Sequence, residues 1–219
     1  MPAYYLEFCV VGLGLILLLL DAFVPGKDKR WLGIVGIFGL AGVYFLMFSA
    51  KGGQPVPNEP SYWDYFTFGE QTFAGFFKGI ALITTMIVIL MGVNYLKVIK
   101  DYTDQDFGAG EFFVLPIFTC AGLMWTAGAT DLISIFVSIE LVSISFYVLV
   151  SFLRRNTGSL EAGVKYLILG ALSTGFLVYG ITWTFGVTGQ PNLDEIQKVL
   201  EAGEVKGLAV LFAFILWIV

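Results

Sequence analysis

Hydrophobic residues in this chain form long uninterrupted runs, where a soluble protein would alternate apolar and polar faces. Uncharged stretches recur at residues 31–50, 79–96, 112–130 and 166–193. Each is about as long as the ~20 helical residues that cross the hydrocarbon core of a bilayer. The pattern predicts an all-α fold, a polytopic membrane helix bundle.

The runs divide the chain into about seven expected transmembrane segments. These segments cover approximately residues 4–24, 31–50, 74–96, 112–129, 132–153, 160–185 and 205–219. The connections PGKD, GGQPVPNEP, NTGS and GQPN carry the glycine, proline and asparagine residues typical of turns. The longest connections have about 20 residues, which is too short for a separate redox or nucleotide-binding domain.

Basic residues are divided unequally between alternate connections. Those after the first, third and fifth segments hold seven: Lys27, Lys29, Arg30, Lys97, Lys100, Arg154 and Arg155. The other side holds three: Lys51, Lys198 and Lys206. The positive-inside rule then predicts a multi-pass membrane protein with its N-terminus outside. Because basic residues follow the first segment and none precedes it, that segment is expected to be a retained helix rather than a cleavable signal.

The connection PNLDEIQKVLEAGE, on the predicted outer side, has a helical pattern of its own. Asn192 followed three residues later by Glu195 resembles a capping box. Its apolar residues fall on one helical face: Leu193, Ile196, Val199 and Leu200. A short amphipathic helix on the outer surface is therefore expected at residues 193–201.

Composition removes several kinds of chemistry. The chain is 58% hydrophobic and 13% charged, and it has no histidine, the commonest haem and metal ligand and neutral-pH proton carrier. Cys9 and Cys120 lie far apart in two expected helices and fit helix packing better than a metal or iron–sulfur site. The chain lacks a GxGxxG or Walker motif, so no cofactor is expected in it. Its net charge of −5, with cations spread among connections, argues against a nucleic-acid partner.

One acid stands near the middle of the otherwise uncharged fifth segment. At 1.5 Å per residue Glu140 lies near the membrane centre, where a charge costs about 2.5–3.5 kcal/mol and needs a partner or water. Ser143, Tyr147 and Ser151 follow on its helical face. This polar stripe favours a hydrated proton or ion path towards the cytoplasm. The alternative is a structural hydrogen-bonding seam between helices.

Other charges lie within or beside the segments. Lys165 follows Glu161 by four residues, so it is either a functional intramembrane charge or a neutralised lysine that reaches to the inner surface. Lys78, among aromatic residues at the outer end of the third segment, favours an interfacial anchor. Asp131 is expected to be a residue of an outer-surface loop.

Two stretches of the chain resemble the proton-translocating antiporter-like subunits of respiratory complex I (NADH-quinone oxidoreductase), and most of all its subunit N family. They are EFFVLPIFTCAGLMWTAGATDLISIFVSIELVSISFYVL and SLEAGVKYLILGALSTGFLVYGITWTFGVTG. The family has an acid in an LE-L-S context on its fifth helix and an S-EA--KY--LGA-S segment on its sixth. Matching positions here are Glu140, Leu141, Ser143, Ser159, Glu161, Ala162, Lys165, Tyr166, Gly170, Ala171 and Ser173. The similarity covers about residues 110–190.

This resemblance implies a membrane subunit of a proton-pumping NADH-quinone oxidoreductase that carries part of a half-channel. It also implies a place in the cell inner membrane, where the outside N-terminus would be periplasmic. Glu140 and Lys165 would translocate protons, and Glu161 would support them. Residues 1–110 would form three N-terminal helices, and residues 111–219 the first antiporter-like repeat, helices four to seven. In the family a lysine on a broken seventh helix pairs with the fifth-helix acid. The chain stops at Val219 before that position, so a C-terminally truncated, split or partial subunit is expected.

The resemblance also implies partners and leaves other functions open. Neighbouring antiporter-like subunits and other membrane subunits of complex I would surround the chain, together with lipid. NADH, FMN, iron–sulfur clusters and quinone would bind to other subunits. Alternative functions are a subunit of a multisubunit Na⁺/H⁺ antiporter or membrane hydrogenase, or a structural subunit that translocates no ions.

Overall fold

The computed structural model describes residues 5–24, 29–49, 71–103, 109–153, 156–203 and 207–218 of the chain. Eight α-helices make up nearly all of these described ranges. They are α1 (Tyr5–Phe23), α2 (Arg30–Ser49), α3 (Gln71–Thr103), α4 (Ala109–Gly128), α5 (Leu132–Val150), α6 (Thr157–Thr188), α7 (Leu193–Glu201) and α8 (Gly207–Ile218).

Six of these helices, α1 to α6, are long and apolar enough to cross a membrane. α8 is also apolar, but its 12 residues reach only roughly 18 Å against a hydrocarbon core of ~30 Å. The expected all-α, multi-pass membrane bundle is therefore confirmed. Within the described residues the seventh segment is shorter than a full span.

Helix α3 is longer than the hydrophobic pattern predicts. The pattern gives a segment at 74–96, whereas the helix has 33 residues and continues to Thr103. Hydropathy marks the part of a helix that is suited to lipid, and it does not report where helical hydrogen bonding stops. α3 therefore extends beyond its apolar part into a polar stretch that includes Lys97 and Asp101.

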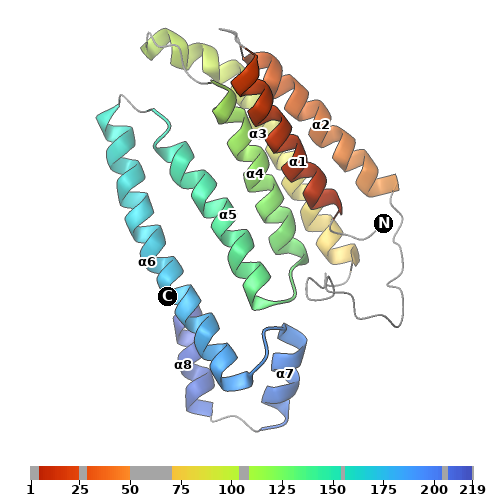
Figure 1. Cartoon of the computed structure of the whole chain (residues 1–219), viewed down its shortest axis with the longest axis vertical. Coiled ribbons are helices and arrows are strands. Elements are labelled where there is room, and N and C mark those ends of the chain that lie inside the picture. Colours follow the sequence, from red (N-terminus) through yellow and green to blue (C-terminus); the bar gives the residue numbers. More distant parts are fainter. Residues whose placement is uncertain are drawn as a thin grey trace.

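Helices α1 to α4 pack together into a bundle (Figure 1). α4 lies at its centre, because it contacts each of α1, α2 and α3. Phe113 and Ile117 of α4 are fully buried in the core. A carbon added to Gly33 of α2 would lie 2.9 Å from the Phe113 ring. Glycine at this position lets α2 and α4 approach closely, as small residues do in membrane helix packing.

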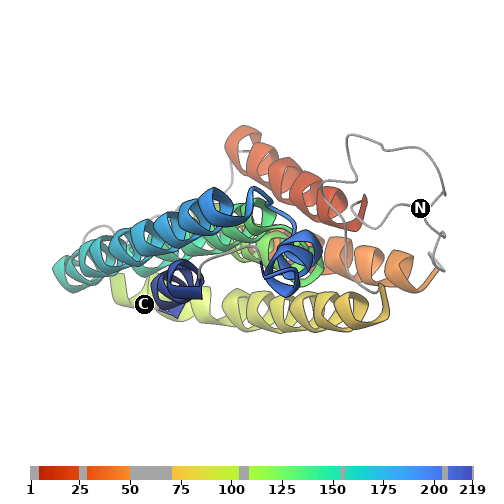
Figure 2. The ribbon, with the colours of Figure 1, turned by 90° about the horizontal axis from the view of Figure 1, so that it is seen from below.

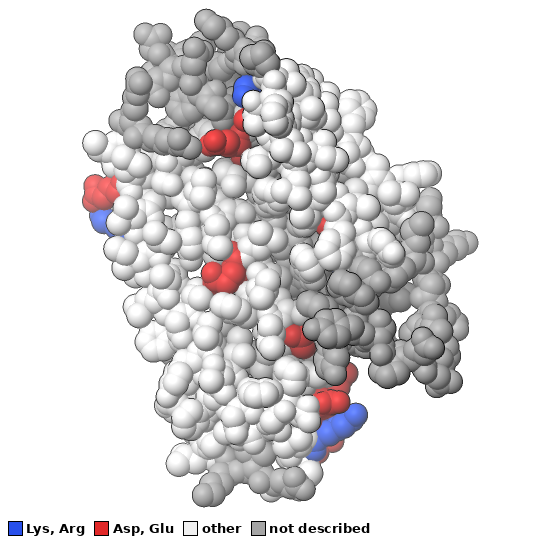
Figure 3. Space-filling view, viewed as in Figure 1, with Lys and Arg blue, Asp and Glu red and all other residues white. Residues whose placement is uncertain are grey.

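Beyond the bundle, α5 packs on α4, α6 packs on α5, and α8 packs on α6 (Figure 1). α6 exposes large apolar side chains along its length, among them Leu160, Val164, Leu167, Leu169 and Leu172. Figure 3 shows that charged side chains are few between the two ends of the face it draws. Such a surface is suited to lipid or to neighbouring membrane helices.

The expected amphipathic helix is present as α7, with the predicted bounds (Figure 2). Its N-cap residue Asn192 accepts a hydrogen bond from the Asp194 backbone N–H at 2.9 Å. Ile196 is buried beneath the helix, as its place on the apolar face predicts. The cap and the one-sided hydrophobic pattern were therefore sufficient to locate this element.

The turn between α4 and α5 is joined to the turn between α6 and α7. Two backbone hydrogen bonds of 3.0 Å connect them, from Leu132 N–H to the Pro191 carbonyl and from Leu193 N–H to the Thr130 carbonyl. Asp131, expected on a surface loop, is buried in this turn junction, where its carboxylate accepts a hydrogen bond from the Ser134 N–H as the N-cap of α5. Asp131 is therefore a turn residue as expected, but the expected surface exposure is wrong, because the turn between α6 and α7 pairs with this turn.

Candidate functional site

Helix α5 carries two polar faces, one towards α4 and one towards α6. On the α4 side Ser134, Ser138 and Ser145 are buried. The Thr126 hydroxyl of α4 donates to Ser138 Oγ at 2.9 Å, and Ser138 donates to the carbonyl of Ile135. Ser145 donates to a carbonyl of its own helix, that of Leu141. This face is a hydrogen-bonded packing seam, because its hydroxyls are satisfied within the two helices.

Glu140 lies on the opposite side of α5, facing α6. The Thr174 hydroxyl of α6 donates a hydrogen bond to Glu140 Oε1 at 2.8 Å. Both residues are near the middle of their membrane-spanning helices, and Glu140 is half-buried. Among the described residues no Lys or Arg forms an ion pair with Glu140. The neutral hydroxyl of Thr174 is therefore the partner that the structure provides for this acid.

Tyr147 and Ser151 continue the Glu140 face along α5 and meet glycines of α6. The Tyr147 hydroxyl lies against Gly170, where a side-chain carbon would collide with it, and its ring packs edge-on against the Tyr166 ring at 5.1 Å. Ser151 lies against Gly163 and donates to the Tyr147 carbonyl at 2.9 Å.

Three residues of the predicted polar stripe, Glu140, Tyr147 and Ser151, therefore face α6. Ser143 stands between Glu140 and Tyr147 on α5 and is half-buried. Because Ser151 bonds to its own helix, the described side chains do not form one continuous hydrogen-bonded chain from Glu140. The stripe therefore places polar side chains, which a proton path requires, where α5 and α6 pack closely together.

Lys165 is not brought to Glu140. It lies on α6 nine residues before Thr174, which is roughly 14 Å along the helix axis. Its ammonium pairs with Glu161 at 2.6 Å, and the two side chains are 70% and 66% exposed. The predicted i, i+4 pair is therefore present. Because the Lys165 side chain is exposed, its ammonium can also contact groups beyond the described residues.

Lys78, expected to anchor α3 at the membrane interface, is instead buried within the bundle. Its ammonium lies 2.6 Å from Glu7 Oε1 of α1, and the side chains are 5% and 0% exposed. The interfacial prediction is wrong. The aromatic residues near Lys78 pointed to the membrane surface, whereas the helical position of Lys78 places it on the buried face of α3.

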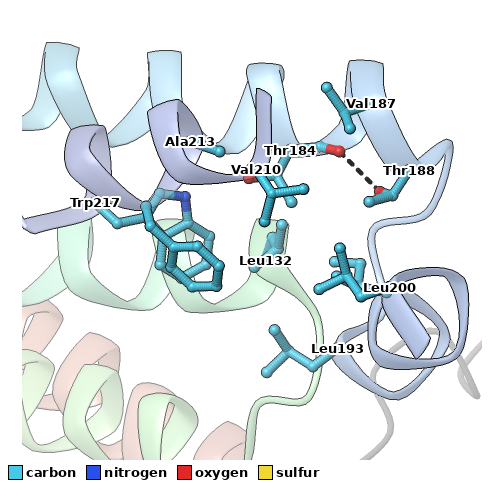
Figure 4. Close-up of a pocket in the computed structure, with 11 residues that line it drawn as sticks. Leu132, Thr184, Val187, Thr188, Leu193, Leu200, Val210, Ala213 and Trp217 are labelled. Atoms are coloured by element: carbon cyan, nitrogen blue, oxygen red, sulfur yellow. Dashed lines mark hydrogen bonds between the residues drawn. The ribbon is translucent and has the colours of Figure 1, made fainter. Parts of the chain in front are cut away.

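An apolar cavity of about 100 Å³ lies between α6, α7, α8 and the start of α5 (Figure 4). Leu132, Leu193, Leu200, Val210 and Trp217 are among its lining residues. Its two threonine hydroxyls, those of Thr184 and Thr188, donate to carbonyls of α6. None of the described residues that line the cavity is titratable. Within the described residues, no cluster of three His, Cys, Asp or Glu side chains suited to a metal ion occurs either.

Sequence reasoning located Glu140 but missed Thr174. A usable signal was present, since α5 and α6 are antiparallel and joined by a short turn. Residues at similar distances from that turn face each other, which places Thr174 opposite Glu140 and Gly163 opposite Ser151. The pattern of one segment alone does not reveal this, because the partner lies on the next helix.

Known proteins are similar to the chain over nearly its whole length. Residues 129–219 match the family model described as NADH:quinone oxidoreductase/Mrp antiporter, TM. NADH-quinone oxidoreductase subunit N of Trichlorobacter lovleyi is 37% identical over 194 residues, which cover 89% of this chain and 37% of that protein. The chain thus spans less than half the length of this relative.

Solved structures agree with the sequence match. A chain of respiratory complex I from Thermus thermophilus shares the fold with a TM-score of 0.68 and 22% identity, covering 97% of this chain and 42% of that one. A chain of the archaeal membrane-bound sulfane sulfur reductase gives a TM-score of 0.71 at 18% identity, covering 99% and 43%. By sequence the chain is similar to subunit N of NADH-quinone oxidoreductase, and its fold is similar to part of the chains in these two solved complexes.

Proposed function

We propose that the chain is a membrane subunit of a proton-pumping NADH-quinone oxidoreductase, in which Glu140 carries protons within part of a half-channel. The observation that carries this proposal is the hydrogen bond from Thr174 to Glu140, in the middle of two spanning helices. An ionised acid at that depth of the membrane costs free energy, and such acids mark proton or ion paths. The relatives named as subunit N support the assignment to that enzyme.

The contact with Thr174 suits an acid that changes protonation state. When Glu140 is ionised, the Thr174 hydroxyl donates to the carboxylate. When Glu140 binds a proton, its carboxyl O–H requires an acceptor, and the same hydroxyl oxygen can accept it. A single rotatable hydroxyl therefore stabilises both forms without a helix movement.

Protons would reach Glu140 along the α5–α6 interface. Ser143, Tyr147 and Ser151 follow Glu140 on its face of α5 towards the end of that helix, which the cation distribution predicts to be the cytoplasmic end. Lys165 and Glu161 lie near that same end on α6. Lys165, paired with Glu161, would be a second charged group of the proton path near that end.

The redox chemistry would take place elsewhere in the complex. NADH, FMN, iron–sulfur clusters and quinone would bind to other subunits. This chain would contact other membrane subunits, including neighbouring antiporter-like subunits. The apolar surface of α6, with Lys165 in it, is suited to such a neighbour.

Replacing Thr174 by valine tests the site directly, because valine keeps the shape and removes the hydroxyl. A hydrogen bond to a charged group contributes about 1.5 kcal/mol, so we expect an approximately tenfold slower NADH-driven proton uptake by inverted membrane vesicles. Thr174→Ser retains the hydroxyl and is expected to pump near the unaltered rate. Equal rates in all three proteins would contradict a role for this contact.

The proposed direction of proton movement depends on the membrane orientation. Of the cations that predict it, Lys27, Lys51, Arg154, Arg155 and Lys206 lie outside the described residues. Thr157 and Glu201 are exposed at opposite ends of the spanning helices and can report the topology. In a protein lacking Cys9 and Cys120, we expect Glu201→Cys to react with an impermeant thiol reagent outside intact cells. Thr157→Cys should resist it. The reverse pattern would make the stripe an exit path.

A further inference from the structure

The bundle of α1 to α4 contains a buried ion pair that the proposed proton path does not use. Glu7 of α1 and Lys78 of α3 are 2.6 Å apart and almost completely shielded from solvent. On α1 Glu7 belongs to a buried stripe with Val10, Gly14 and Leu17. On α3 Lys78 belongs to a stripe with Ala74, Ala81, Leu82, Thr85 and Ile89. Two charges thus occupy positions of the core that otherwise hold mainly apolar or small residues.

Stability does not explain why these positions are charged. The desolvation penalty of a buried ion pair often exceeds its attraction, and well-packed apolar residues of similar volume are commonly as stable or more stable. The apolar contacts of α1 and α3 with α2 and α4 already hold the bundle together. An intramembrane ionisable pair in such surroundings therefore points to a function.

The carboxylate of Glu7 has unused capacity to bind a proton. Its second oxygen, Oε2, is buried and accepts no hydrogen bond from the described residues. Lys78 is the charge that acts on Glu7. The other titratable groups described on α2 and α4 are Arg30, Tyr44, Glu111 and Cys120. Arg30 and Glu111 lie in the first turns of their helices, at the end of the bundle opposite Glu7.

We propose that Glu7 and Lys78 form a second proton-binding site of the chain, separate from Glu140. A proton from the aqueous phase at the end where α1 begins adds to Glu7 Oε2, and the pair changes from net neutral to a single positive charge. Lys78 keeps its proton throughout. Its positive charge favours the carboxylate form of Glu7, so the added proton can leave again. This proposal rests on the proposed function in one respect, because both assume that residues of this chain bind protons.

Infrared difference spectroscopy of the assembled complex in lipid vesicles tests the site, because it detects protonated carboxyl groups without NADH or quinone. The informative variant changes both residues together, Glu7→Leu with Lys78→Met, so that neither charge of this pair is left without the other. We expect it to lose a carboxyl band that appears and disappears with pH in the unaltered complex. Glu195→Gln removes an exposed carboxylate of α7 and is expected to leave that band in place.

An unchanged carboxyl spectrum in the double variant would overturn the proposal and make the pair a structural clamp. If the double variant does not assemble, Glu7→Asp keeps the charge and shifts the carboxylate by one methylene. A band of altered frequency in that variant supports the site, and an unaltered spectrum overturns it. These outcomes are independent of pumping, so a failure at Glu140 and a failure at Glu7 are distinguishable.

Discussion

Replacing Glu140 by glutamine is expected to abolish the proton translocation that we propose for this chain. Glutamine keeps the size of the side chain and an oxygen that can accept the Thr174 hydroxyl, but it cannot take up a proton. The substitution also removes a charge from the membrane interior, so the fold should be retained or slightly stabilised. The effect therefore reports on proton transfer and not on assembly.

The measurement is NADH-driven acidification of inverted membrane vesicles, with NADH oxidation followed in the same sample. We expect the number of protons moved for each NADH oxidised to fall, while the complex is present at its normal level. Glu195→Gln provides the matched control, because it makes the same chemical change on the exposed surface of α7. Normal pumping by the Glu140→Gln protein would favour the structural-subunit alternative.

Replacing Gly122 by leucine is expected to separate α5 from the bundle. A carbon added at Gly122 would lie 2.7 Å from Val142 Cγ2 and 3.0 Å from the Ser138 backbone carbonyl of α5. A side-chain end can rotate away, but a helix backbone cannot, so α5 has to move as a whole. Overpacking of this kind costs about 1–3 kcal/mol. Because α6 packs on α5, the Glu140–Thr174 contact moves with it.

Thermal unfolding of the purified complex, followed by the loss of assembled material, measures this effect. Gly12→Leu is the matched control, since a carbon added at Gly12 of α1 meets nothing within 4 Å. The Gly122 variant should unfold at a lower temperature and pump less, and the Gly12 variant should do neither. Equal unfolding temperatures for the two variants would show that α4 and α5 do not depend on this close approach.

Features encoded within one segment could be predicted from the sequence. The six spanning helices follow from uninterrupted hydrophobic runs, and α7 follows from its cap and its one-sided apolar face. The depth of Glu140 follows from its place in the fifth segment. In each case the physical cause is the transfer of side chains from water to lipid or to a protein core. This transfer depends on residues that are close together in the chain.

Contacts between segments could not be predicted in the same way. Lys78 looks like an interfacial lysine until α1 places Glu7 beside it, and about 70 residues of chain separate the two. The pattern predicts an exposed Asp131, whereas the turn before α7 pairs with the Asp131 turn and buries this residue. Such pairings depend on how helices distant in sequence rotate against each other, and one hydropathy pattern holds no information on that rotation.

The turn junction constrains how the Glu140 site can move. The α5–α6 pair is held at one end by its short covalent connection and at the other by the two backbone hydrogen bonds between the 130–132 and 191–193 turns. Two helices that are connected at both ends cannot slide along each other unless one of the two connections breaks. Rearrangement at Glu140 is therefore confined to side-chain rotation, or to bowing of the helices between two fixed points. Displacement of α5 relative to α6 can therefore be largest near Glu140, midway between the two connections, while the helix ends keep their positions.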